Sequence, residues 1–450
     1  MTVHTWLTIA AASFAPLPYG STDPFWIGAW VLVLAAALAI APLGAFNRAQ
    51  ERALCWMICL WLTYSAIAAL QILPNPPLLA HEAWLQAKEL LGAAPSPRIS
   101  ARDSIPLDAL GRTLLAILAF CNGFIVGARQ QEARRLLDWV AYAGATVALY
   151  AVAAELAAPS HLLFRSKTAY LGDMTGTFVN RNTAATFFAV ISTLWLFAIL
   201  RKAARIHLYV GGLMLIVPQH EAAARSLALR IMALSISAIA LLGTHSRGGV
   251  LAFAFGLATC AAIVLLEKGK TLLLAALAAL VTIIYRHGGT IVSRVESEGL
   301  SDGGRWTTYR SSLKLVVEHP WLGTGLGTFE DVFPMVRGNG AFTSGVWDKA
   351  HNTVVEIAVE MGLPMAASVV IAASWILYST YRAALESEGR RRADLLALSC
   401  IAVTAFAHSL MDFSMQIPGF LAPFAILLGV ASALSLQTKD EAVRRQKSAA

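Results

Sequence analysis

The sequence predicts an all-α, polytopic membrane protein with about twelve transmembrane helices. Composition is the first reason, because 57% of the 450 residues are hydrophobic and only 14% are charged, whereas soluble domains carry roughly 25% charged residues. The second reason is the recurrence of apolar runs that approach the ~20 residues a membrane-spanning helix needs. The third is that Lys and Arg gather in short clusters between these runs, a pattern that specifies membrane orientation. The net charge of +8 therefore does not indicate a nucleic-acid partner.

The apolar runs place the predicted helices along the whole chain. The first run is cut short by Pro16 and Pro18, and the ninth is short as well. A further stretch at 81–88 is expected to form a short amphipathic helix on the surface. The spanning helices are expected near residues 4–18, 25–46, 52–73, 110–128, 138–158, 183–201, 228–245, 248–266, 271–286, 353–380, 394–412 and 418–436.

Six basic clusters set the predicted orientation. Five follow the second, fourth, sixth, eighth and tenth helices, and one occupies the tail at 437–450. All six fall on the inner side if the helices alternate and both termini are inside. We therefore expect one integral membrane domain over 1–450. Its outer side receives residues 74–109 and 159–182, the large loop 287–352 between the ninth and tenth helices, and the link Phe413–Ile417.

Arg247 lies between two apolar helices, flanked by Ser246 and the pair Gly248–Gly249. An arginine at the membrane–water boundary is either an anchor that snorkels to the interface or an anion-binding group. The adjacent glycines favour the second interpretation, because a ligand can approach a glycine backbone closely.

Arg305 and Arg310 lie in the large outer loop at a spacing expected to put both on one face of a helix. One interpretation is a solvated helix. The other is a second cationic arm opposite Arg247, because the planar guanidinium forms paired hydrogen bonds to phosphate. Trp306 and Trp321 in the same loop either stack on sugar faces or pack the loop against the membrane.

His351 begins the tenth predicted helix, directly after the large loop. The helix dipole favours the neutral imidazole there, and such a group can accept a proton from a hydroxyl. The alternative is an ordinary boundary residue beside a capping Asn352 or Thr353. The run Gly323–Gly327 lacks the strand–turn–helix context and the Lys-Ser/Thr of a phosphate loop, so we expect tight turns rather than a nucleotide site.

Several segments in this order resemble the O-antigen ligase and O-antigen polymerase superfamily, a group of polytopic bacterial glycosyltransferases. The signature region spans about residues 180–365. Within it the matching segments are Ser246–Gly249, Gly304–Trp306, His319–Phe329, Ala350–Asn352 and Glu360–Pro364. Two more, Gly176–Asn182 and His408–Pro418, are similar to segments of exopolysaccharide-polymerase relatives.

The resemblance implies a GT-C-like glycosyltransferase in the bacterial inner membrane, with its site facing the periplasm. The donor would be a glycan on undecaprenyl pyrophosphate, and the acceptor would be lipid A–core or another glycan. No metal or cofactor is implied. Arg247 and Arg305 would hold the pyrophosphate, and His351 would activate the acceptor hydroxyl. The resemblance and the residue types together suggest a substrate site that also includes Arg181, Arg310, Asn352, Trp306 and Trp321.

Three functions remain open at this point. The single large outer loop favours a ligase, and a polymerase for O-antigen or exopolysaccharide is the alternative. A transporter or flippase for lipid-linked saccharides belongs to a different class, and it predicts broken helices with polar residues at the bilayer midplane. The charged residues of this sequence instead lie at helix ends, which disfavours transport.

Overall fold

The computed structural model describes residues 1–43, 46–76, 79–92, 96–206, 221–268, 303–337 and 347–449. These ranges are mostly α-helical, and their sheet structure is one pair of two-residue strands, β1 and β2. Seven of the described helices are long and apolar enough to cross a membrane: α3, α5, α6, α7, α8, α14 and α16. The predicted fold class, an all-α polytopic membrane protein, is confirmed.

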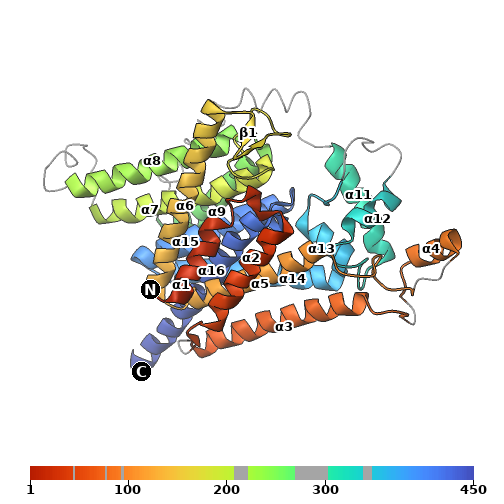
Figure 1. The fold of residues 1–450 in the computed structure, drawn as a ribbon. Helices are drawn as coiled ribbons and strands as arrows, with labels where there is room; N and C mark the ends of the chain where they lie inside the picture. Colours follow the sequence, from red (N-terminus) through yellow and green to blue (C-terminus); the bar gives the residue numbers. More distant parts are fainter. Residues whose placement is uncertain are drawn as a thin grey trace.

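In chain order the described elements are α1 (Val3–Phe14), η1 (Tyr19–Ser21), α2 (Pro24–Ala39), α3 (Arg48–Gln71), α4 (Ala83–Leu91), α5 (Leu107–Gly127), α6 (Gln130–Ala157), β1 (His161–Leu162), β2 (Arg165–Ser166), α7 (Arg181–Ile206), α8 (Glu221–Gly243), α9 (Arg247–Lys268), α11 (Gly303–Glu318), α12 (Phe329–Val336), α13 (Thr353–Met361), α14 (Leu363–Leu385), α15 (Gly389–Ser409), η5 (Ser414–Gln416) and α16 (Pro418–Ala449). The short helices α4, α11, α12 and α13 gather at one end of the bundle (Figure 1).

Each predicted helix that falls on described residues has a counterpart, and the one at 271–286 lies outside them. The short helix at 81–88 appears as α4. The tenth helix, expected to be continuous over 353–380, is wrong in one respect: it is broken into α13 and α14 at Gly362, whose φ is +82°. Helix α16 continues beyond the predicted span at 418–436 into the tail at 437–450 and ends at Ala449.

Small residues let the central helices α5 and α16 pack closely. Gly123 and Gly127 of α5 form a Gly-xxx-Gly pair facing α16. A Cβ atom added at Gly123 would lie 2.1 Å from the carbonyl oxygen of Ile426, so no larger residue fits without movement. Because lipid supplies no hydrophobic force between helices, such backbone contact is a main source of helix association in membranes. The pair α5–α16 therefore forms the centre of the bundle.

The two ends of the bundle are chemically different. At one end Asp394, almost fully buried, accepts hydrogen bonds from Arg134 of α6 and Arg201 of α7. At the other end the start of α7 contacts the loop that follows α15. Helix α7 rises roughly 28 Å from Asn182 to Arg201 at ~1.5 Å per residue. This rise is close to the ~30 Å thickness of the hydrocarbon core of a bilayer. Both termini lie at one end of Figure 1, and α4, α11 and α12 lie at the opposite end.

The glycine-rich run forms tight turns against the break between α13 and α14. Gly323, Gly325 and Gly327 all have positive φ, at +70°, +116° and +78°, which glycine adopts without strain. The N–H groups of Thr324 and Gly325 donate to the carbonyls of Val359 and Glu360 at 2.8 and 3.1 Å. These N–H groups therefore pair with carbonyl groups in the last turn of α13. This is the behaviour expected of a tight turn, whereas a phosphate loop would leave its N–H groups open to a ligand.

Candidate active site

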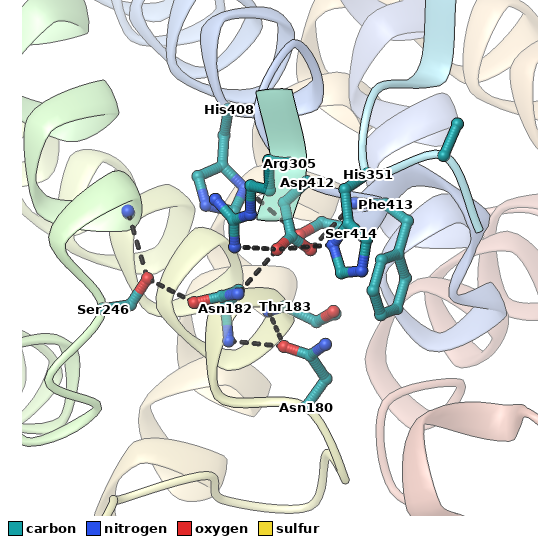
Figure 2. Close-up of polar contacts among 12 residues, drawn as sticks. Asn180, Asn182, Thr183, Ser246, Arg305, His351, His408, Asp412, Phe413 and Ser414 are labelled. Atoms are coloured by element: carbon teal, nitrogen blue, oxygen red, sulfur yellow. Dashed lines mark hydrogen bonds and ion pairs between the residues drawn. The ribbon is translucent and has the colours of Figure 1, made fainter. Parts of the chain in front are cut away.

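Asp412 is the centre of a polar cluster at the α4–α11–α12 end of the bundle. Its side chain is fully buried, in the loop between α15 and α16. Oδ2 accepts a hydrogen bond from the Asn182 amide at 2.6 Å, and Oδ1 accepts from the backbone N–H of Phe413 at 2.8 Å. Arg305 lies on another side, with Nη2 at 3.4 Å from Oδ2. Figure 2 shows the carboxylate between Arg305, Asn182 and His351.

His351 presents its ring to the same carboxylate. Nδ1 lies 3.8 Å from Oδ2 of Asp412, and this nitrogen is buried without a hydrogen-bond partner. Trp347 and Phe413 make edge-to-face contacts with the imidazole, with ring centroids at 5.3 and 4.8 Å. The arrangement fixes the ring plane and leaves Asp412 as the nearest acceptor described for Nδ1. A small shift would complete a histidine–aspartate hydrogen bond.

The backbone of His351 is held in an unusual conformation. Its φ is +53°, a left-handed value that costs a non-glycine residue energy. Tyr309 donates its hydroxyl to the His351 carbonyl at 3.0 Å, and Glu356 accepts the N–H of Ala350 at 2.8 Å. Asn352 caps α13 and also donates to the carbonyl of Leu410 at 2.9 Å. These contacts place the imidazole against Asp412 in spite of the strain.

Helix N-termini converge on the cluster. Asn180 caps α7, Ser246 caps α9 and Asn352 caps α13, each through a side-chain oxygen that accepts backbone N–H groups. Arg305 lies in the first turn of α11. The positive ends of helix dipoles favour anions, so this end of the bundle is suited to a phosphate group as well as to the buried carboxylate.

A chain of hydrogen bonds joins the two segments that carry the predicted arginines. Ser246 donates its hydroxyl to Oδ1 of Asn182 at 2.8 Å, and Asn182 donates in turn to Asp412 (Figure 2). Asp412 then faces Arg305. Arg247 follows Ser246 directly and begins α9. The structure thus brings the start of α9 and the start of α11 to one carboxylate.

His408 lies beneath the loop that carries Asp412. Its Nδ1 is 2.7 Å from the hydroxyl of Thr186 and 3.2 Å from that of Ser414, and the residue is 1% exposed. Both partners are hydroxyl groups that rotate to suit either tautomer. The histidine thereby ties α15 to α7 and η5, and it supports the Asp412 loop from below.

The pKa of Asp412 lies below its ordinary value. Burial alone would raise it, but the adjacent His351 and the charges of His408 and Arg305 together outweigh burial. The carboxylate therefore stays ionised at neutral pH. A permanent negative charge next to an imidazole holds the ring in a fixed orientation and favours its protonated form during a reaction.

A second carboxylate, that of Asp173, contacts residues at the starts of α7 and α9. Asp173 accepts from Nη1 of Arg181 at 2.9 Å and lies 2.8 Å from Nδ1 of His245. Arg181 and Asn182 therefore contact different aspartates. The expected substrate-binding residue Arg181 is placed beside the site, with its guanidinium committed to Asp173 and over the ring of Tyr170.

The remaining predicted residues lie around the cluster without entering it. Arg310 is exposed on α11, and five residues after Arg305 it is turned by roughly 140° about the helix axis. The expectation that both share one face is therefore wrong. Trp306 and Trp321 are 59% and 69% exposed, so both indole rings are available to a ligand or to lipid. Asn352 serves as the helix cap described above.

Asp412, Asn182 and Tyr309 are site residues that the sequence reasoning did not select. A signal for Asp412 exists, because it is the one Asp, Glu, Lys or Arg between Asp394 and Lys439. A lone charge in a short link between two apolar helices is costly and calls for a partner. Asn182 and Tyr309 carry no such signal, since neutral polar residues are common at helix ends.

Residues 232–370 match the family model described as O-Antigen ligase. This part of the chain is similar to O-antigen ligases. The predicted resemblance to this superfamily of glycosyltransferases is thereby confirmed. The matched range contains Arg247, Arg305 and His351, whereas Asn182 and Asp412 lie on either side of it. No curated protein matches the chain.

Proposed function

We propose that this O-antigen ligase-type protein transfers a saccharide from undecaprenyl pyrophosphate to an acceptor hydroxyl at the periplasmic face of the inner membrane. One observation carries the proposal: His351, Asp412 and Arg305 meet at one end of a membrane bundle. An imidazole beside a carboxylate serves as a general base, and a guanidinium beside it suits a departing diphosphate. The opposite end of the bundle carries the basic cluster around Asp394, which supports the orientation.

The acceptor hydroxyl gives its proton to His351 in this mechanism. With Nδ1–H directed at Asp412, Nε2 is left with the lone pair that accepts the proton. The hydroxyl oxygen then forms a bond to the anomeric carbon of the donor sugar. The distance of 3.8 Å between Nδ1 and Oδ2 shortens when the imidazolium forms, because catalytic hydrogen bonds commonly tighten in the substrate complex.

The bond between the anomeric carbon and the phosphate oxygen breaks in the same step, and the electron pair leaves with the diphosphate. Arg305 and Arg247 stabilise the negative charge that develops there, and the N-termini of α7, α9 and α13 add their positive dipole ends. A direct displacement of this kind inverts the configuration of the anomeric carbon. No step of this displacement draws on a metal or a cofactor.

The acceptor distinguishes the two candidate activities within this chemistry. A ligase uses lipid A–core, and we favour it because the described outer elements α11 and α12 belong to a single large loop. A polymerase uses a second lipid-linked glycan. The polysaccharide profile of a deletion strain separates the two: free lipid-linked polymer with bare core indicates a ligase, and single repeats alone indicate a polymerase. Unchanged lipopolysaccharide and exopolysaccharide would contradict both.

A further inference from the structure

A second histidine–aspartate pair lies next to the candidate active site. Nδ1 of His245 is 2.8 Å from Oδ1 of Asp173, and the other oxygen of this carboxylate accepts from Arg181 at 2.9 Å. The side chain of Asp173 is 6% exposed, whereas that of His245 is 39% exposed. The carboxylate therefore holds one edge of the imidazole, and Nε2 on the other edge is the nitrogen open to a ligand.

His245 and His351 share the same local setting. Their φ values are +51° and +53°, in the left-handed region that costs a non-glycine residue energy. Each comes directly before the residue that caps a helix, Ser246 for α9 and Asn352 for α13. Each also presents Nδ1 to an aspartate from a distant part of the chain. The proposed function gives His351 a role, that of the base, and leaves its counterpart without one.

The turn that carries His245 is joined to the Asp412 cluster. The hydroxyl of Ser246 donates to Asn182, whose amide donates to Asp412 (Figure 2). Arg247, which is expected to hold the donor diphosphate, comes two positions after His245. The second histidine and the expected diphosphate-binding arginine therefore belong to one short segment at the start of α9.

Tyr170 lies near both aspartates. The guanidinium of Arg181, which pairs with Asp173, lies over the Tyr170 ring at 5.4 Å from its centroid. Burial raises the pKa of Tyr170, and the negative charge of Asp412 raises it further. The two histidine–aspartate pairs therefore flank one tyrosine at the same end of the bundle.

Two imidazoles suit the two ends of a group transfer. In the proposed mechanism the acceptor hydroxyl loses a proton to His351, while the departing diphosphate gains a negative charge. An imidazolium can supply a proton to that charge, because imidazolium and phosphate exchange protons readily near neutral pH. The guanidinium of Arg247 cannot do so, since it stays protonated. His245, with Asp173 as its counter-charge, adds the group that the arginines lack.

We propose that His245 is the general acid of the transfer, held by Asp173 against the diphosphate of the donor. This role rests on the proposed function for the reaction itself. As the bond between the anomeric carbon and the phosphate oxygen breaks, its electron pair stays on that oxygen, and a proton moves from Nε2 of His245 to the diphosphate. The acceptor hydroxyl gives its proton to His351 in the same step. Exchange with water then resets both rings, and no net proton is gained or lost.

Chemical rescue tests the proton transfer. His245→Ala should lower the single-turnover rate by about a hundredfold. Added imidazole should restore part of this rate, because the exposed site admits a free imidazole, whereas a structural defect would not respond. His245→Gln keeps a hydrogen-bond donor but gives up no proton, so it should stay slow. His161→Ala, at an exposed histidine of β1, is the matched control and should transfer like the original chain.

The outcomes of the rescue experiment decide the acid role. An original rate in either His245 variant, or a loss that imidazole does not restore in a folded His245→Ala protein, overturns it while the proposed function stands. Thermal unfolding shows whether each variant is folded. If His245→Ala does not fold, the rate of the His245→Gln protein and the protection experiment below still decide.

Chemical protection reports the contact with diphosphate without any transfer. Diethyl pyrocarbonate modifies accessible imidazoles, and mass spectrometry locates the modified residue. With the original chain in nanodiscs, undecaprenyl diphosphate should slow modification of His245 and leave that of His161 unchanged. Equal modification of His245 with and without this lipid overturns the proposal, even where saccharide transfer is observed. If His245 is protected but no saccharide is ever transferred, the diphosphate contact stands, and the proposed function fails together with the acid role.

Discussion

The side-chain amide of Asn182 donates a hydrogen bond of 2.6 Å to Oδ2 of Asp412, joining the start of α7 to the loop before α16. The other side of the same amide accepts from Ser246 at 2.8 Å. These two hydrogen bonds, one donated and one accepted, fix the orientation of the Asn182 amide. Because Asp412 also faces Arg305 and His351, this one amide sets the relative positions of a predicted anion-binding group and a predicted base.

Replacing Asp412 by Asn keeps the shape of the side chain and removes its charge. We expect Asp412→Asn to lower turnover by about a hundredfold, because the imidazolium formed at His351 loses its counter-charge. Donor affinity should change much less. Transfer assays with purified protein give both quantities. Asp348→Asn, an exposed acid in the same region, should match the original chain, and an active Asp412→Asn protein would refute the role.

His351→Ala should lower turnover by about two to four orders of magnitude if the imidazole is a general base. Binding of the donor lipid should stay near its original value, because the diphosphate is held by arginines. His351→Gln keeps a hydrogen-bonding group but cannot take up a proton, so it separates positioning from proton transfer. A Gln variant that transfers at the original rate would reduce His351 to an orienting residue.

The two arginines should not tolerate lysine. Arg305→Lys and Arg247→Lys are each expected to lower transfer by about a hundredfold, since a point charge cannot reproduce the paired hydrogen bonds that stabilise a leaving diphosphate. Single-turnover rates and protein levels should be recorded together. Lys314→Ala removes an exposed charge from the same helix as Arg305 and should have little effect. Near-normal rates for both lysine variants would leave the arginines as membrane anchors.

Glu360 should make stability depend on pH. Burial, with the nearby Glu356, raises its pKa to about 7, whereas a glutamate in the unfolded chain titrates near ~4.3. Between these values the folded protein holds a proton that the unfolded chain releases, so stability falls as pH rises through this window. The drop in Tm between about pH 5 and pH 8 should be smaller in Glu360→Gln. Glu89→Gln, an exposed control, should retain the full drop.

Cysteine labelling tests the orientation of the bundle. In a background without the native cysteines, an impermeant reagent applied to spheroplasts should modify Gly92→Cys, at the end of α4. It should miss Glu388→Cys, in the link between α14 and α15. Both positions are exposed, so the difference reports sidedness. Labelling of Glu388→Cys in sealed cells would reverse the topology and with it the periplasmic site.

Hydrophobic length predicted the helices well because a spanning helix must satisfy all its backbone groups within lipid. The run at 110–128, for example, corresponds to α5 at Leu107–Gly127. The break at Gly362 escaped this reasoning because apolar residues continue on both sides of it. Gly362 and Pro364 together were the available signal, since glycine adopts positive φ and proline favours the first turn of a helix.

The candidate site was predictable in part. Residue type and position made Arg247, Arg305 and His351 candidates, and the family resemblance then gave each of them a role. Asn182 and Asp412 are 230 positions apart, and their contact depends on α7 and α15 packing side by side. No local periodicity encodes that contact. The shared face expected for Arg305 and Arg310 failed because five residues are not a whole number of helical turns.

The position of Asp412 late in the chain has a consequence for how the protein is made. Synthesis proceeds from the N-terminus, so Asn182, Ser246, Arg305 and His351 all enter the membrane before the residue that joins them. Until the hairpin of α15 and α16 inserts, the helix starts carry cationic groups with no Asp412 carboxylate between them. Insertion of the α15–α16 hairpin therefore completes both the helix bundle and the site. A nascent chain truncated within α15 would hold every residue of the family-matched region and still lack an assembled site.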